Sequence, residues 1–144
     1  MEKIIAKKMK MAQIWKDGNV VPVTPLLCQT GDIDAFLSSL KEGEMVAVSG
    51  TSRGKGFQGT VKRHGFHGGP ATHGQKDRLR APGSLGPTAP QRVVKGRKMA
   101  GHTGNRRVTV KNLMVAKIQP EEKIVMVRGA VPGNKGGKIE IRNK

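Results

Sequence analysis

The stretch GTSRGKGFQGTVKRHGFHGG, residues 50–69, marks a change in the character of the chain. It opens a segment, residues 51–107, with 13 Lys and Arg, one acid (Asp77), 12 of the 20 Gly and all four His. Phe57 and Phe66 are the only aromatic residues in it. So few large apolar side chains cannot offset the entropy of ordering 57 residues. The sequence therefore predicts that this segment has no core of its own and that the fold is built by its flanks.

Charge is concentrated in the same segment. The whole chain has 144 residues and a net charge of +17, which divides into 0 for residues 1–50, +12 for 51–107 and +5 for 108–144. Such self-repulsion is relieved by a polyanion, and nucleic acid is the first candidate. With 3% aromatic residues the chain lacks a stacking platform for single-stranded bases, so a folded RNA recognised through its backbone and shape is the expected target.

The flanks have the pattern of a small β protein. Short apolar or β-branched runs bounded by turn residues predict strands at 3–6, 11–15, 20–28, 45–49, 108–118, 124–131 and 138–142. Ile33, Phe36, Leu37 and Leu40 share one face of a predicted helix that Asp32 could cap. We predict a mainly β fold: a small antiparallel barrel formed by 1–50 and 108–144, from which 51–107 leaves as a long, basic, Gly-rich extension loop whose two ends lie close together.

Several functional classes are disfavoured by the sequence. No apolar run approaches the roughly 18 residues of a membrane span, and the N-terminus does not resemble a signal peptide, so we expect a cytoplasmic protein without a membrane partner. The single cysteine, Cys28, lies in an apolar run and is interpreted as a core residue. GTSRGKG has neither the spacing nor the hydroxyl of a phosphate-binding loop, and the four His have no thiolate and one carboxylate near them. We therefore expect no catalytic residue, no metal and no cofactor.

The residues also resemble a known family. The region VSGTSRGKGFQGTVKRHGFHGGPATHGQKDRLRAPGSLGPTAPQRVVKGRKMAGHTGNRRVTVKNL is similar to the signature of the bacterial form of large-subunit ribosomal protein three, the universal L3 family. KKMKMAQIWKDGNVVPVTPL and KIVMVRGAVPGNKGGKIEI resemble the opening and the C-terminal strands of that family. The resemblance implies a β-barrel body in the large ribosomal subunit and a loop that extends through ribosomal RNA toward the peptidyl transferase centre, with its tip at about residues 66–90. It also implies early binding during subunit assembly and contacts with neighbouring ribosomal proteins. We expect no homo-oligomer.

Two sets of matched residues are the candidate RNA-binding site. The first set consists of side chains that can neutralise or hydrogen-bond phosphate and ribose: Arg53, Lys55, Lys62, Arg63, His64, His67, His73, Lys76, Arg78, Arg80, Arg92, Lys95, Arg97, Lys98, Arg106 and Arg107. The second set consists of glycines expected to allow close approach or unusual φ: Gly54, Gly56, Gly59, Gly68, Gly69, Gly83, Gly86 and Gly101. GFQGTVKR is predicted to form a short helix with Phe57 and Val61 facing inward.

The chain departs from the family in length. Residues 25–44 span only 20 positions where family members carry an insertion, so one or more barrel strands are expected to be missing and the sequence leaves open whether the barrel closes. Three functional alternatives also stay open: an architectural protein that binds RNA or DNA off the ribosome, an RNA-processing enzyme, and a merely disordered basic segment.

Overall fold

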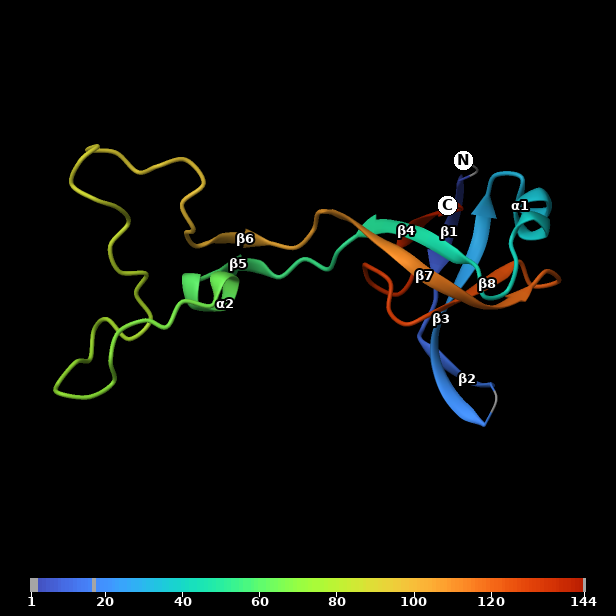
Figure 1. Cartoon of the computed structure of the whole chain (residues 1–144), viewed down its shortest axis with the longest axis horizontal. Coiled ribbons are helices and arrows are strands. Elements are labelled where there is room, and N and C mark those ends of the chain that lie inside the picture. Colours follow the sequence, from blue (N-terminus) through green and yellow to red (C-terminus); the bar gives the residue numbers. More distant parts are fainter. Residues whose placement is uncertain (1–2, 17, 144) are drawn as a thin grey trace. The chain divides into compact units, whose positions relative to one another are not determined.

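The computed structural model describes residues 3–16 and 18–143, and the chain forms two compact units. The first unit consists of Met1–Arg53 and Asn105–Lys144, and the second of Gly54–Gly104. The elements of the first unit, labelled in Figure 1, are β1 (Lys3–Lys8), β2 (Ala12–Lys16), β3 (Asn19–Thr30), α1 (Ile33–Ser39), β4 (Met45–Thr51), β7 (Arg107–Gln119), β8 (Ile124–Arg128) and β9 (Lys138–Asn143).

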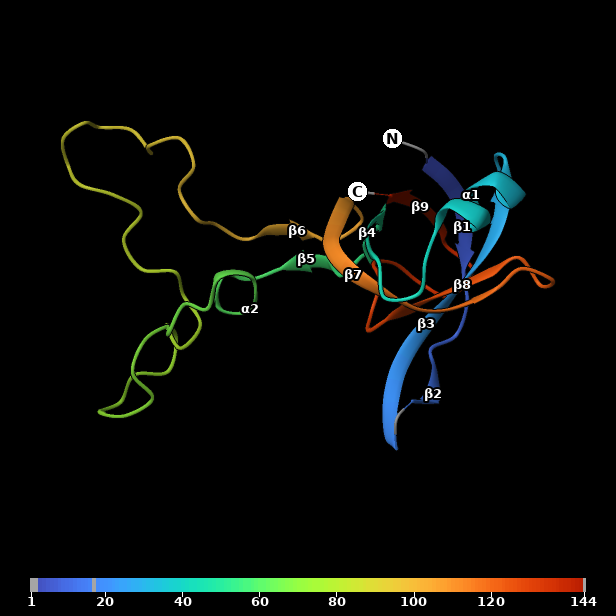
Figure 2. The same cartoon turned by 45° about the vertical axis from the view of Figure 1, so that its right-hand side comes forward.

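Six of these strands form a closed antiparallel barrel. The order around it is β1-β9-β4-β7-β8-β3, and β3 pairs with β1 to complete the ring, with Ala6 opposite Cys28. The curled strands can be followed in Figure 2. β2 lies outside the ring because, within the described residues, it pairs with β3 alone. The predicted mainly β fold is confirmed, and the closure that the sequence left open is achieved by the β1–β3 pairing.

The barrel interior is filled by aliphatic side chains that alternate along each strand. On β9, Ile139 and Ile141 are buried while Glu140 between them faces outward, and Val46 and Val48 on β4 follow the same period of two. Cys28 is 4% exposed in this core, and burial raises the pKa of its thiol to about 11. A thiol with this pKa remains protonated and unreactive, which confirms the interpretation of Cys28 as a core residue.

The helix α1 contributes one side of the core. Phe36, Leu37 and Leu40 belong to the same buried cluster as the strand residues, and Ile33 packs against it, as the periodicity predicts. The predicted cap is wrong in detail, because the Asp32 side chain makes no capping hydrogen bond. Its backbone carbonyl instead accepts the Phe36 N–H at 2.9 Å. No helix in the described part of the chain is long and apolar enough to cross a membrane.

Candidate nucleic-acid interface

The segment of high charge begins and ends on two paired strands. Gly50 lies opposite Val108 and Thr51 opposite Arg107 in the β4–β7 ladder. Beyond the ladder, the Ser52 N–H donates to the Arg106 carbonyl at 2.9 Å. The prediction that the two ends of the segment lie close together is therefore confirmed.

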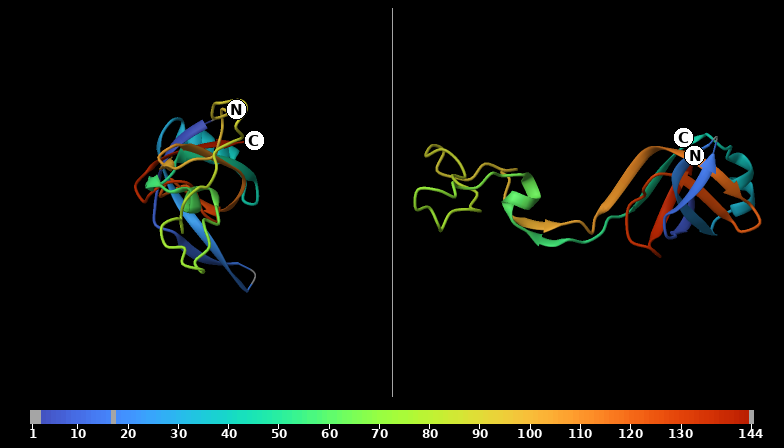
Figure 3. Two further views of the ribbon diagram at one scale, coloured as in Figure 1. Left: turned by 90° about the vertical axis from the view of Figure 1, so that its left-hand side faces the viewer. Right: turned by 90° about the horizontal axis from the view of Figure 1, so that it is seen from below.

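The second unit has little regular structure. β5 (Gly56–Gln58) pairs with β6 (Gly101–Thr103), and the short helix α2 (Thr60–His64) follows β5. These elements lie together in the right-hand view of Figure 3. α2 ends at Gly65, whose φ of 73° is the left-handed conformation that favours glycine at this position.

The helix predicted over GFQGTVKR is shorter than expected. It begins at Thr60, because Gly59 is extended, with ψ 166°, and Phe57 belongs to β5 instead. Phe57 lies opposite His102 and is 74% exposed, so the expectation that it faces inward is wrong. The second unit has too few apolar side chains to form a core that would bury Phe57.

Two basic residues of α2 are held against the returning chain. Arg63 Nη1 donates to the Met99 carbonyl at 2.8 Å, and His64 Nε2 lies 3.0 Å from the same oxygen. A Cβ added at Gly101 would lie 2.5 Å from Arg63 Nη1, so the guanidinium occupies the space that a side chain at residue 101 would need. Both residues therefore join the outgoing and returning parts of this unit, and the guanidinium keeps further N–H donors for a ligand.

Gly68 and Gly69 allow two segments of the unit to pass at close range. A Cβ at Gly68 would lie 2.0 Å from the Leu79 carbonyl oxygen, and one at Gly69 would lie 2.7 Å from the Arg78 oxygen. The Gly69 N–H donates to that Arg78 oxygen at 3.1 Å. At these two glycines the close approach is to the chain's own backbone, and their approach to RNA stays a prediction.

The other predicted glycines differ among themselves. Gly56 and Gly83 have the expected positive φ, as does Gly68, at 66°, 79° and 77°. Gly59 has open space around its Cβ position, and a Cβ at Gly86 would meet only the end of the Arg97 side chain. No requirement for glycine is evident from these surroundings at Gly59 or Gly86.

The second unit exposes its charge. Of its residues, all of which the structure describes, only Thr60 is buried. Its ten Lys and Arg against Asp77 give +9, and the two ion pairs found among the described residues both involve Glu140 in the barrel. A hollow of ≈ 710 Å³ is lined by His64, His67, Arg78 and Lys98, among others. The unit can accept anions because its cations are exposed and, as far as the structure describes the chain, have no carboxylate partners.

The structure distributes the sixteen candidate side chains over both units. Arg53, Arg106 and Arg107 belong to the barrel unit, and the other thirteen belong to Gly54–Gly104. All are exposed except His64, which is half-buried. Among the described residues no three His, Cys, Asp or Glu side chains come together as a metal site would require.

A barrel that carries a strongly basic unit without a core is typical of a protein that binds nucleic acid. Comparison with known proteins identifies the family. Residues 26–123 match the family model described as ribosomal protein L3. The chain belongs to the ribosomal protein L3 family.

Curated relatives agree with this assignment. The large ribosomal subunit protein uL3 of Herpetosiphon aurantiacus is 59% identical over 100 residues, covering 69% of this chain and 47% of the relative. For uL3 of Dehalococcoides mccartyi the identity is 54% over 107 residues, 74% of this chain and 52% of the relative. For uL3 of Chlorobium phaeovibrioides the identity is 48% over 126 residues, which cover 87% of this chain and 56% of the relative. The chain spans about half the length of the curated relatives it matches.

Proposed function

We propose that the protein is a structural constituent of the large ribosomal subunit that binds large-subunit ribosomal RNA, in the cytoplasm, without performing catalysis. The observation that carries the proposal is the second unit: ten exposed Lys and Arg, one acid and a single buried residue. Phosphates would supply the counter-charge that the protein lacks, and RNA would supply packing partners for a chain that has no core. Membership of the L3 family gives the ribosomal context.

The finer proposal is that residues 51–107 form an RNA-penetrating extension of the barrel body, 1–50 and 108–144, directed toward the peptidyl transferase centre. The resemblance to the family supports this direction. Early participation in subunit assembly and contacts with neighbouring ribosomal proteins belong to the same proposal. Each candidate basic side chain acts by neutralising phosphate or bonding ribose, so binding requires no metal, cofactor or second copy of the chain.

Cosedimentation and salt dependence test the general proposal. The protein is expected to migrate with large subunits on a sucrose gradient at moderate salt. With about 6 to 10 phosphate contacts, affinity for large-subunit RNA should fall about 10³- to 10⁵-fold between 50 and 200 mM salt. Duplex DNA that competes as well as RNA would favour an architectural role off the ribosome, and specific RNA cleavage with Mg²⁺ would reveal an enzyme.

A tethered probe tests the position of the second unit. Cys28 is buried, so a cysteine introduced by Ala71→Cys, at an exposed position, can be labelled selectively with an iron chelate. Radicals generated from residue 71 in reconstituted subunits should cleave RNA of the peptidyl transferase region. Lys117→Cys on the barrel serves as the matched control and should cleave elsewhere. Identical cleavage patterns would contradict the proposed direction.

A further inference from the structure

Four neighbouring barrel strands, β1, β9, β4 and β7, present one continuous outer face. Their registers align Ile5 with Glu140, Glu140 with Ser49, and Ser49 with Thr109, so that one row of outward residues crosses all four strands. The Ser49 and Thr109 hydroxyls are hydrogen-bonded to each other at 2.8 Å. Outward positions above and below this row, two residues along each strand, lie roughly 6.6 Å away.

Cations occupy those outward positions on β1, β9 and β7, but not on β4. We call this surface the outer basic face and define it by Lys3, Arg107, Lys111, Lys138 and Arg142 around Glu140. Lys3 lies directly opposite Arg142 on β1 and β9, and Lys138 precedes Glu140 by two residues on the same strand. The outer basic face thus carries five cations and one acid, a net charge of +4.

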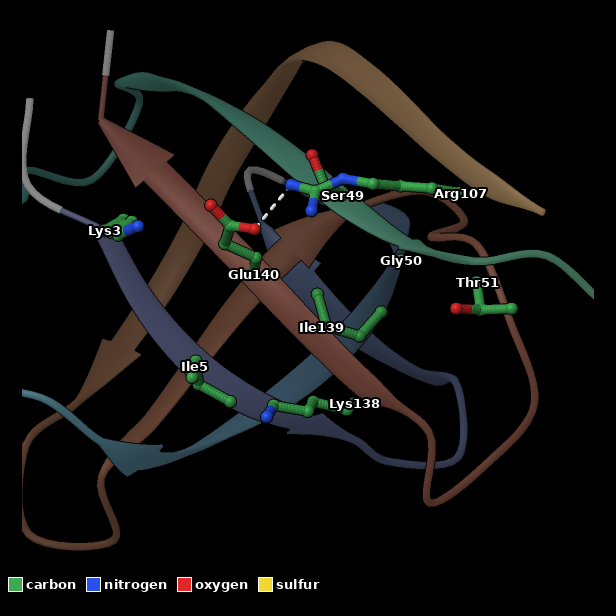
Figure 4. Close-up of a pocket in the computed structure, with 9 residues that line it drawn as sticks. All are labelled: Lys3, Ile5, Ser49, Gly50, Thr51, Arg107, Lys138, Ile139 and Glu140. Atoms are coloured by element: carbon green, nitrogen blue, oxygen red, sulfur yellow. Dashed lines mark hydrogen bonds and ion pairs between the residues drawn. The ribbon is translucent and has the colours of Figure 1, made fainter.

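Glu140 fixes two of the five cations. Its carboxylate accepts from Arg107 Nη2 at 2.5 Å and from Arg142 Nε at 2.8 Å, the first of which is drawn in Figure 4. Hydrogen bonds from Arg142 and then Arg107 lower the pKa of Glu140, so the anchor stays ionised at neutral pH. Each guanidinium retains unused N–H donors in a fixed orientation, which reduces the entropy lost on binding an oxyanion.

Two hollows of this surface share Arg107 in their lining. One hollow of ≈ 360 Å³ is lined by Lys3, Lys138 and Arg107, among others. A second, of ≈ 610 Å³, is lined by Arg107, Lys111 and Arg142, among others. The remaining described acids of the barrel unit lie in α1 with its N-cap and in the turns at 41–44 and 120–123. Among the described residues, Glu140 is therefore the one acid on the outer basic face.

We propose that the outer basic face is a second RNA-binding surface, on which the phosphate backbone of large-subunit ribosomal RNA crosses strands β1, β9, β4 and β7. This inference rests on the proposed function and adds to it a contact made by the barrel body. The partner is a polyanion with repeated phosphates, because the cations lie on three of the four strands, β1, β9 and β7, and line two separate hollows. Only Arg107 of these residues is among the candidates predicted from sequence, since the register that assembles the others is a tertiary feature.

The salt dependence of RNA binding by the full chain tests the proposal. The variant Lys3→Ala/Lys138→Ala removes two exposed cations from the face, and Lys41→Ala/Lys117→Ala removes two exposed cations from other parts of the barrel. Binding of both variants to a large-subunit RNA transcript is measured from 50 to 200 mM salt. The slope of log affinity against log salt should become shallower by about 2 for the first variant and remain that of the wild type for the second.

A single substitution on a different strand protects the test from a folding artefact. Lys111→Ala leaves the β1–β9 pairing untouched and should make the slope shallower by about 1. The outcomes separate the two proposals. If the wild type binds the transcript no better than duplex DNA, the proposed function fails. If the wild type prefers the transcript but the face variants keep its slope and affinity, the proposed function stands and the outer basic face is not an RNA surface.

Discussion

The ammonium group of Lys8 lies 2.7 Å from the carbonyl oxygen of Val131, to which it donates a hydrogen bond inside the barrel unit. A second hydrogen bond reaches the Gly133 carbonyl at 2.8 Å. Lys8 is only 8% exposed, and desolvation, followed by the charge of Arg53, lowers its pKa. The contact ties β1 to the turn before β9. A Cβ at Gly133 would in turn lie 2.7 Å from the Thr51 carbonyl oxygen, at the end of β4.

Replacing Lys8 by Met should destabilise the barrel. The substitution keeps the apolar stem but removes the donors from two carbonyls, and hydrogen bonds to charged groups contribute about 1.5–3 kcal/mol each. The free energy of unfolding in urea should fall by about 2–3 kcal/mol, since the released carbonyls regain some water. Lys7→Met, at the exposed neighbouring position, is the control and should change it little. Equal losses in the two variants would contradict the role of the buried ammonium.

Gly68→Ala should disturb the second unit without affecting the barrel. The added Cβ would be 2.0 Å from the Leu79 oxygen. Residues 68–69 and 78–79, which cross at close range and are joined by the Gly69–Arg78 hydrogen bond, must therefore move apart. Gly74→Ala is a matched control, because Gly74 has nearly the same φ, +76° against +77°, but open space around the added atom. We expect RNA affinity about tenfold lower for Gly68→Ala than for Gly74→Ala, corresponding to about 1.4 kcal/mol.

The melting temperature of the barrel should be the same in both glycine variants. An equal loss of RNA affinity in the two variants would mean that the loss comes from the positive φ and not from the contact with the Leu79 backbone.

Glu140→Gln should change how stability depends on pH. Because the two arginines lower the folded-state pKa of Glu140, its ionisation stabilises the fold above its unfolded pKa, near 4.5. This contribution is lost as pH falls through the lower, folded-state value. The wild type should therefore be more stable than Glu140→Gln at pH 7, and the difference should shrink on acidification below about 4.5. Urea unfolding of both proteins from pH 7 to 3 measures it, and a constant difference would argue against the ionised anchor.

Cys28 should resist thiol reagents in the folded protein. The thiol is 4% exposed and its pKa is about 11, so little thiolate is present and little of it is accessible at pH 8. Mass spectrometry after iodoacetamide treatment should find the wild-type chain unmodified under native conditions and modified in urea. Rapid modification without denaturant would show that the barrel opens readily at the β1–β3 pairing, where Cys28 lies opposite Ala6.

Much of the architecture follows from local pattern. The strands were predictable because each has a short apolar run between turn residues, and α1 because Phe36, Leu37 and Leu40 recur at helical spacing. The prediction that Phe57 belongs to the short helix is wrong, because the spacing of Phe57 and Val61 indicates a buried helix face only where a core exists to cover it. Barrel closure also escaped prediction, since the pairing of Ala6 with Cys28 depends on the curvature of strands distant in sequence.

In the candidate site, too, some features follow from the sequence and others only from the tertiary structure. The sequence alone determined where the charge resides, because composition is additive along the chain and a single acid among residues 51–107 cannot neutralise 13 cations. Only the tertiary structure decided which residues meet. It placed Gly68 against the Leu79 backbone, Arg63 on Gly101, and Glu140 between Arg107 and Arg142. The physical reason is that strand register and chain crossing join residues far apart in sequence, and no local propensity encodes such distances.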